Sequence, residues 1–233
     1  MNGFRWISGL FLVIGMLFAV QSAAAHRPSF GDQQELTEIE NIDISNAFYR
    51  QLGSPSQVDA YVFDAQAGER LHAGINIPAL TGLEEYQVSV ALFGPGLPEA
   101  GHDVLPEVHP EDLGALVFSP AVSEDFFEPF TQTRYWGRQQ IDMDLPETGT
   151  YYLLVWSSEG KSGKYVLDVG EAEVFGPADL LRFPVWWLQA RLYFGQGPVL
   201  ALAGMLLLIT AVAVITLRGG FTRLGKPRSQ NEI

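Results

Sequence analysis

The sequence has no cysteine, and this absence excludes several kinds of site. Disulfide bonds, thiolate nucleophiles, cysteine-based zinc sites and a lipid anchor on a lipobox cysteine are all ruled out. Positive charge is also scarce, because 14 Lys and Arg residues stand against 27 Asp and Glu residues, for a formal net charge of −13. A surface this acidic repels phosphate backbones, so we expect no nucleic acid among the partners.

Common catalytic motifs are absent as well. The chain contains no G-x-S-x-G, H-E-x-x-H, G-x-x-x-x-G-K-[ST] or G-x-G-x-x-G pattern. Its histidines are His26, His72, His102 and His109, and nothing in the sequence pairs one of them with a nucleophile. We therefore expect a protein without catalytic activity and without a resident cofactor, and a hydrolase with an unrecognised Ser/His/Asp site is an open alternative.

The N-terminal segment, residues 1–25, has the pattern of a secretory signal peptide. Arg5 precedes an apolar run from Ile7 to Val20, and Ala23-Ala24-Ala25 follows. A short basic region, an apolar region of about 7–15 residues and an A-x-A site form the export pattern. An uncleaved anchor is the alternative.

The segment 198–217 contains no charged residue, and a basic tail, 218–233, follows it. A helix of this length reaches about 30 Å, the thickness of the hydrocarbon core, and the positive charges indicate a cytoplasmic tail. The sequence thus predicts a transmembrane helix and a single-pass type I protein of the bacterial cell membrane. Its large domain would be extracytoplasmic, in the periplasm or at the cell exterior. A buried core helix is the alternative.

Between the domain and this segment, residues 179–197 mix apolar and basic side chains. Tryptophan and tyrosine favour the headgroup layer of a lipid bilayer, and arginine pairs with lipid phosphate. We expect an interfacial helix in which Trp186, Trp187, Arg191 and Tyr193 contact the membrane. The alternative is a helix packed on the domain.

Residues 26–178 read as a series of short strands. Apolar and polar residues alternate at 61–63, 71–77, 86–93, 151–156 and 164–169, and Gly, Pro, Asn and Asp separate these runs. No long amphipathic helical period occurs before residue 179. The pattern predicts an all-β domain, an antiparallel β-sandwich.

Three groups of residues carry a resemblance to a known family: Ser45 and Leu52; then Asp59, Tyr61, Phe63 and the turn Ala67-Gly68; then Leu145-Pro146, 148–152 and 163–167. In this order they resemble the bacterial pre-peptidase C-terminal (PPC) domain. The resemblance implies a jelly-roll-like sandwich that accompanies secreted enzymes and is not itself catalytic. An insertion at about 98–140 departs from the family pattern, so the strand order there stays open.

The insertion holds the strongest candidate metal site. His102, Asp103, Glu107 and His109 lie close together in sequence, and imidazole and carboxylate groups could bind a divalent metal ion. The spacing fits no standard ligand motif, however, and a solvated acidic loop is the alternative. A calcium site using Asp142 and Asp144 is a further hypothesis, although no calcium-loop spacing is present.

An aromatic run near the end of the insertion is a candidate ligand or partner surface. It includes Phe127, Arg134, Tyr135 and Trp136, and exposed aromatic rings beside polar groups suit a glycan or a protein partner. The same run could close the edge of the sandwich as core.

From these patterns we expect a membrane-anchored, extracytoplasmic binding or assembly module. Its partner would be another envelope protein or a glycan. Two alternatives stay open: a divalent-metal-binding envelope protein that uses the loop from His102 to Asp112, and the hydrolase.

Overall fold

The computed structural model describes residues 26–31, 36–99, 101, 106, 109–110, 112–120 and 125–224, with the side chains of 199 and 217–224 left out. The predicted signal peptide therefore lies outside the described residues. The chain divides into two compact units, Met1–Ala190 and Arg191–Ile233. We call the first of these the β unit.

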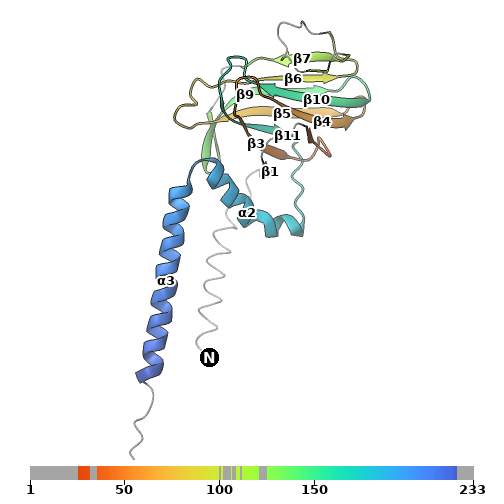
Figure 1. Ribbon diagram of the computed structural model, residues 1–233. Helices are drawn as coiled ribbons and strands as arrows, with labels where there is room; N and C mark the ends of the chain where they lie inside the picture. Colours follow the sequence, from red (N-terminus) through yellow and green to blue (C-terminus); the bar gives the residue numbers. More distant parts are fainter. Residues whose placement is uncertain are drawn as a thin grey trace, which may run out of the picture. The chain divides into compact units, whose positions relative to one another are not determined.

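The described strands all belong to the β unit (Figure 1). They are β1 (Arg27–Phe30), β2 (Thr37–Glu38), β3 (Asn46–Leu52), β4 (Val58–Ala65), β5 (Arg70–Pro78), β6 (Ser89–Gly94), β7 (Gly114–Phe118), β8 (Asp125–Glu128), β9 (Thr133–Asp144), β10 (Gly149–Trp156) and β11 (Gly163–Val169). Two helices follow, α2 (Pro177–Tyr193) and α3 (Gly197–Leu224).

The strands form two sheets. Sheet A has the order β1-β3-β11-β5-β9-β8, and sheet B has the order β2-β4-β10-β6-β7. The prediction of a β-sandwich is thereby confirmed. Most pairs are antiparallel as expected, but β1 pairs with β3 and β2 pairs with β4 in parallel.

A core of alternating side chains lies between the sheets. β5 turns Leu71, Ala73, Ile75 and Ile77 inward, because successive residues of a strand point to opposite faces. The other large contributions come from Tyr61, Phe63, Val90, Leu92, Tyr151, Leu153, Val155, Tyr165, Leu167 and Val169. Each such side chain contributes roughly 1.5–3 kcal/mol when fully buried.

Part of the predicted insertion forms strands. Within it, β7 pairs with β6 at one edge of sheet B, and β8 and the first part of β9 extend sheet A beyond β5. The strand order that the sequence left open is therefore β6-β7 in one sheet and β5-β9-β8 in the other.

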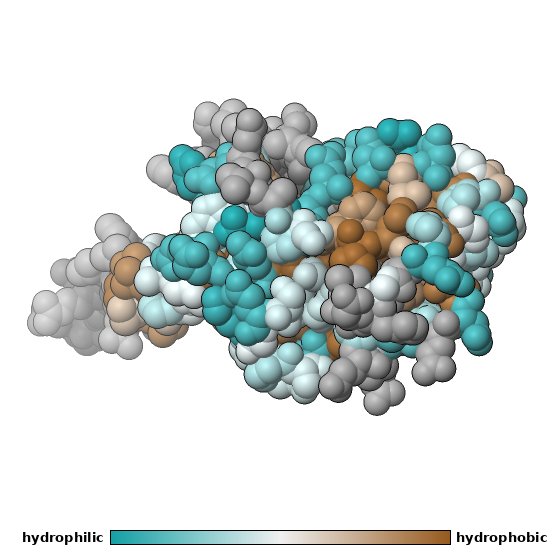
Figure 2. Space-filling model, turned by 90° about the horizontal axis from the view of Figure 1, so that it is seen from above, coloured by the Kyte–Doolittle hydropathy of each residue, from teal (hydrophilic) through white to brown (hydrophobic). Residues whose placement is uncertain are grey.

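A second apolar cluster covers the outer face of sheet B. Ala91, Phe93, Ala115, Leu154 and Trp156 form it, and they alternate with the inward residues of the same strands. On the face that Figure 2 shows, hydrophilic residues cover most of the β unit, and apolar residues gather in one area near its middle.

The helix α2 starts two residues before the predicted segment 179–197. Asp179 accepts a hydrogen bond from the backbone N–H of Gly176 at 2.8 Å and pairs with Arg27 at 3.0 Å. An acidic side chain in the first turn satisfies backbone donors and favours the positive end of the helix dipole. Phe183 adds contacts with Phe130 and Phe175, so α2 up to Ala190 packs on the β unit.

The prediction for the second helix needs correction. Among the described residues, no helix is long and apolar enough to cross a membrane. This finding contradicts the transmembrane helix predicted at 198–217, the single-pass type I topology and the cell-membrane localisation.

Candidate functional site

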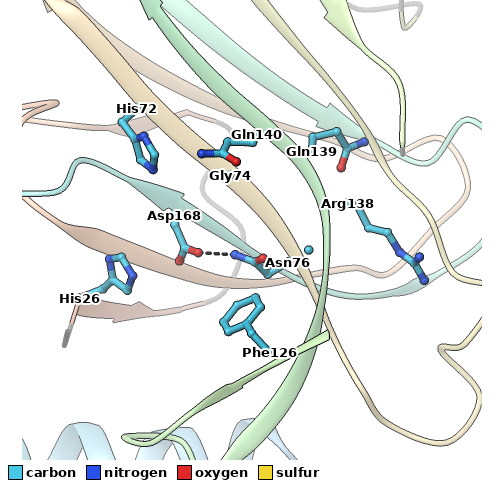
Figure 3. A pocket seen from close by; sticks show the side chains of 10 residues that line it. His26, His72, Gly74, Asn76, Phe126, Arg138, Gln139, Gln140 and Asp168 are labelled. Carbon is cyan, nitrogen blue, oxygen red and sulfur yellow. Dashed lines mark hydrogen bonds between the residues drawn. The ribbon is translucent and has the colours of Figure 1, made fainter. Parts of the chain in front are cut away.

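A groove of about 530 Å³ lies on the outer face of sheet A (Figure 3). Its lining combines polar and aromatic side chains from several strands: His26, His72, Asn76, Phe126, Arg138, Gln140 and Asp168, with Gly74 and Gly137 between them. The volume is within the range of about 300–1,000 Å³ that is common for small-molecule sites.

Strand alternation produces this groove. Because Leu71, Ala73 and Ile75 face the core, the residues between them on β5, His72, Gly74 and Asn76, face outward. On β11, Asp168 likewise lies between two core residues and faces outward. Its partners on the two neighbouring strands, Ala47 and Gly74, are small. Their size leaves open space around the carboxyl group.

Asp168 and Asn76 form the floor of the groove. The side-chain amide of Asn76 donates a hydrogen bond to Oδ2 of Asp168. Burial raises the pKa of Asp168 to about 6, and the charge of Glu128 adds to this effect, while His26, the Asn76 hydrogen bond and His72 act in the opposite direction. This carboxyl group therefore changes its charge between mildly acidic and neutral pH.

Two histidines line the groove on the side of Asp168. Nδ1 of His26 contacts the hydroxyl of Ser45, which is only 3% exposed. His72 lies 4.0 Å from Asp142 and 3.8 Å from Glu171. Imidazole rings beside carboxylates can donate or accept hydrogen bonds near neutral pH.

Phe126 supplies an aromatic surface to the groove. Its ring is 41% exposed and stacks on Tyr135 at 5.4 Å, with 17° between the ring planes. Tyr135 is 3% exposed, so the partner ring is fixed in the packed structure. The buried ring of Tyr135 therefore holds the Phe126 ring in one orientation.

The predicted ligand surface is divided between the two faces of sheet A. Phe127 is 54% exposed and pairs in register with Arg134, whereas Phe126 pairs with Tyr135 on the opposite face. Trp136 packs against the core between the sheets. The structure thus brings Phe127 and Arg134 together on one face and turns Tyr135 to the other.

A β-bulge shapes the part of the groove that β9 lines. The register between β5 and β9 shifts between Ile75 and Asn76. Gln139 is buried and donates from Nε2 to the carbonyl oxygen of Val88, while Gln140 is exposed in the groove. Next to them, Arg138 lies over the ring of Trp136 at 5.6 Å.

Of the residues predicted to bind metal, His102, Asp103 and Glu107 lie outside the described residues. His109 stacks on Phe93 at 6.0 Å, over the apolar cluster on sheet B, and its Nδ1 is 2.7 Å from the carbonyl oxygen of Pro106. The described part of the chain holds no group of three or more residues that could bind a metal ion. The metal site stays a prediction.

The four residues predicted to contact a membrane differ in their surroundings. Trp187 is exposed, and Trp186 is half-buried beside Phe183. In the second unit, Arg191 is buried and donates to the side chain of Gln196 at 2.8 Å. Tyr193 contacts Phe194 edge to face at 5.1 Å.

Sequence reasoning missed most of the groove. His26 and His72 could be noted only as histidines, while Asn76, Gln140 and Asp168 carry no motif. The usable signal was the alternation on the strand predicted at 71–77, which already turns His72 and Asn76 away from the core.

No family model matches the chain, and no curated protein matches it in sequence. Among solved structures, the chain is similar to PliG of Aeromonas hydrophila, a periplasmic lysozyme inhibitor of g-type lysozyme, with 14% identity over 63% of this chain and 98% of that chain. The TM-score is 0.34, which is too low for this likeness to carry an argument about fold or ligand.

Proposed function

We propose that this protein is a binding module without catalytic activity and that the groove on sheet A is its binding site. The observation that carries the proposal is the hydrogen-bonded pair of Asp168 and Asn76 at the floor of a groove of about 530 Å³. Both residues lie on central strands of the sheet, and polar groups held on rigid strands recognise a ligand without reorganisation.

The family assignment is part of the proposal. We infer a PPC-like, jelly-roll-like sandwich, and the positions of its motifs support this. Asp59, Tyr61 and Phe63 belong to β4, and Gly68 has a φ of 83° in the following turn, where glycine is favoured. Such a domain would act as an accessory to another protein or as a carrier of a glycan-binding surface.

The hydrolase alternative draws on one specific contact. Ser45, His26 and Asp168 lie near one another, and the Ser45 hydroxyl contacts the imidazole of His26. Two features favour binding over hydrolysis: Ser45 is 3% exposed, and Asp168 accepts its hydrogen bond from Asn76. A nucleophile must reach its substrate, and a triad carboxylate orients the imidazole directly.

One experiment separates the two functions. The full chain is screened by ligand-observed NMR against neutral, anionic and cationic oligosaccharides and short peptides, and each mixture is analysed for products after prolonged incubation. We expect ligands that bind the wild type, lose affinity for Asn76→Ala, keep it for Lys161→Ala on a distant loop, and remain intact. Binding that Asn76→Ala leaves unchanged contradicts the proposed site. Turnover that stops in Ser45→Ala supports the hydrolase.

The metal alternative has its own test. Calorimetry with zinc and copper on the full chain, compared with His102→Ala and His109→Ala, would detect a site of micromolar affinity or better. Binding that both substitutions abolish would favour metal handling over the groove as the functional site.

A further inference from the structure

We infer that the groove takes a neutral saccharide, with Phe126 as the stacking platform and Asp168, Asn76 and Gln140 as hydrogen-bonding partners of its hydroxyl groups. This inference rests on the proposed binding function and specifies the chemical class of the ligand.

The aromatic surface fits one face of a sugar ring. The C–H groups of a pyranose form an apolar face that packs against an aromatic ring. Phe126 offers such a ring at 41% exposure, and its stacking on Tyr135 fixes its orientation before a ligand arrives. A preformed aromatic surface loses little conformational entropy on binding.

The polar lining fits the edge of a sugar ring. A hydroxyl group donates one hydrogen bond and accepts up to two. Asp168 offers carboxylate acceptors, the amide of Asn76 keeps its carbonyl oxygen when its NH₂ group donates to Asp168, and Gln140 offers both a donor and an acceptor. Mixed donors and acceptors beside an aromatic ring suit a polyol better than a purely apolar ligand.

Charge selects a neutral ligand over an anionic one. Asp168 lies at the floor, Asp142 and Glu171 flank His72, and Glu128 contributes to the field at Asp168. With a net charge of −13 for the whole chain, an anionic sugar would meet repulsion. Conversely, Arg138 lines the same groove, and its fixed positive charge opposes a cationic ligand there.

Two neighbouring phenylalanines give a matched test. Phe126 and Phe127 are both exposed on β8, but only Phe126 lines the groove, and the two rings lie on opposite faces of the sheet. The full chain is titrated with tetrasaccharides of glucose, mannose, galactose and N-acetylglucosamine, together with oligogalacturonate as the anionic probe and chitosan oligomers as the cationic probe.

We expect at least one neutral tetrasaccharide to bind, with Kd weakened about tenfold or more in Phe126→Ala and within about twofold of wild type in Phe127→Ala. Gln140→Ala changes an exposed side chain, so we expect it to fold like the wild type and to weaken binding by about three- to tenfold. The absence of binding to every neutral probe overturns the inference, as does equal loss of affinity in both phenylalanine variants.

The outcome also separates this inference from the proposed function. If only the anionic or cationic probe binds and Phe126→Ala weakens it, the groove is a binding site and the saccharide class is wrong. If neutral saccharides bind and neither Phe126→Ala nor Gln140→Ala affects them, the site itself is wrong.

Discussion

The hydroxyl group of Tyr165 on β11 donates a hydrogen bond of 2.6 Å to the carboxylate of Asp59 on β4, and so joins the two sheets inside the core. Tyr61 adds a hydroxyl contact of 2.9 Å with Tyr165, and Gln57 donates to the other oxygen of Asp59 at 2.6 Å. A buried polar network of this kind stabilises one packing of the sheets only while each group keeps its partner.

Removing one hydroxyl tests this network. In Tyr165→Phe, the buried carboxylate of Asp59 loses a donor, and we expect the free energy of unfolding to fall by about 1.5–3 kcal/mol. Urea denaturation of the full chain at neutral pH measures it. Tyr152→Phe, on the outer face of sheet B, is the control and should change stability by less than about 0.5 kcal/mol. Equal effects in the two variants would contradict the role of the network.

Asp168 should make stability depend on pH. Its pKa is about 6 in the folded protein against the ordinary value of 3.8, so the native state keeps a proton that the unfolded state releases between those values. The stabilisation is fully present below about pH 4 and is lost as pH rises through about 6. Asp168→Asn keeps a hydrogen-bond acceptor and cannot titrate. We expect its stability relative to wild type to increase by up to roughly 3 kcal/mol from pH 4 to pH 7.

The measurement is a series of urea denaturation curves for wild type and Asp168→Asn across this pH range. A difference between the two proteins that does not change with pH would show that Asp168 has an ordinary pKa. Because the comparison is between variants at each pH, other titrating groups largely cancel.

Gly94 should tolerate no side chain. A Cβ atom there would overlap the ring of Tyr151, whose hydroxyl is held by the carbonyl oxygens of Glu147 at 2.7 Å and Pro95 at 3.1 Å. The ring cannot move without losing these bonds, so we expect Gly94→Ala to destabilise the protein by about 1–3 kcal/mol. Thermal denaturation of the full chain measures this effect. Gly53→Ala is the control, because a Cβ atom at Gly53 would have its nearest neighbour at 3.6 Å. This variant should melt within a few degrees of wild type.

Asp179 should hold the start of α2 on the β unit. Asp179→Ala removes both the bond to the N–H of Gly176 and the ion pair with Arg27, at a local cost of about 1 kcal/mol. A loss of about 1 kcal/mol raises the equilibrium constant for local opening of the helix roughly fivefold. Backbone amide hydrogen exchange in the first turn of α2 should therefore become roughly fivefold faster. Glu173→Ala, an exposed residue before the helix, should leave exchange unchanged. Unchanged protection in Asp179→Ala would show that aromatic packing alone holds the helix.

The sequence predicted five strands at its runs of apolar residues. β4, β5, β6, β10 and β11 all overlap the expected runs, because one face of each strand fills the core. β9 escaped prediction because it breaks this rule. Its Gln139 points into the protein and bonds to the carbonyl of Val88, and the bulge beside it shifts the period by one residue.

The groove could not be predicted because no part of it is local. Its residues come from β5, β8, β9 and β11 and from His26, and they meet only when the strand order of sheet A is known. The sequence left that order open in the insertion. The aromatic run was noted as a candidate surface, but whether Phe126 or Phe127 faces a ligand depends on the register of β8 against β9.

The buried phenols give this protein an intrinsic optical probe. Burial between the sheets raises the pKa of Tyr61, Tyr86 and Tyr165 above the ordinary value of 10.0. Above that pH the unfolded chain releases protons that the native chain retains, so alkali drives unfolding. Tyrosinate absorbance from these rings therefore appears only as the sheets separate, and an alkaline titration followed in the ultraviolet reports sandwich opening without any added dye.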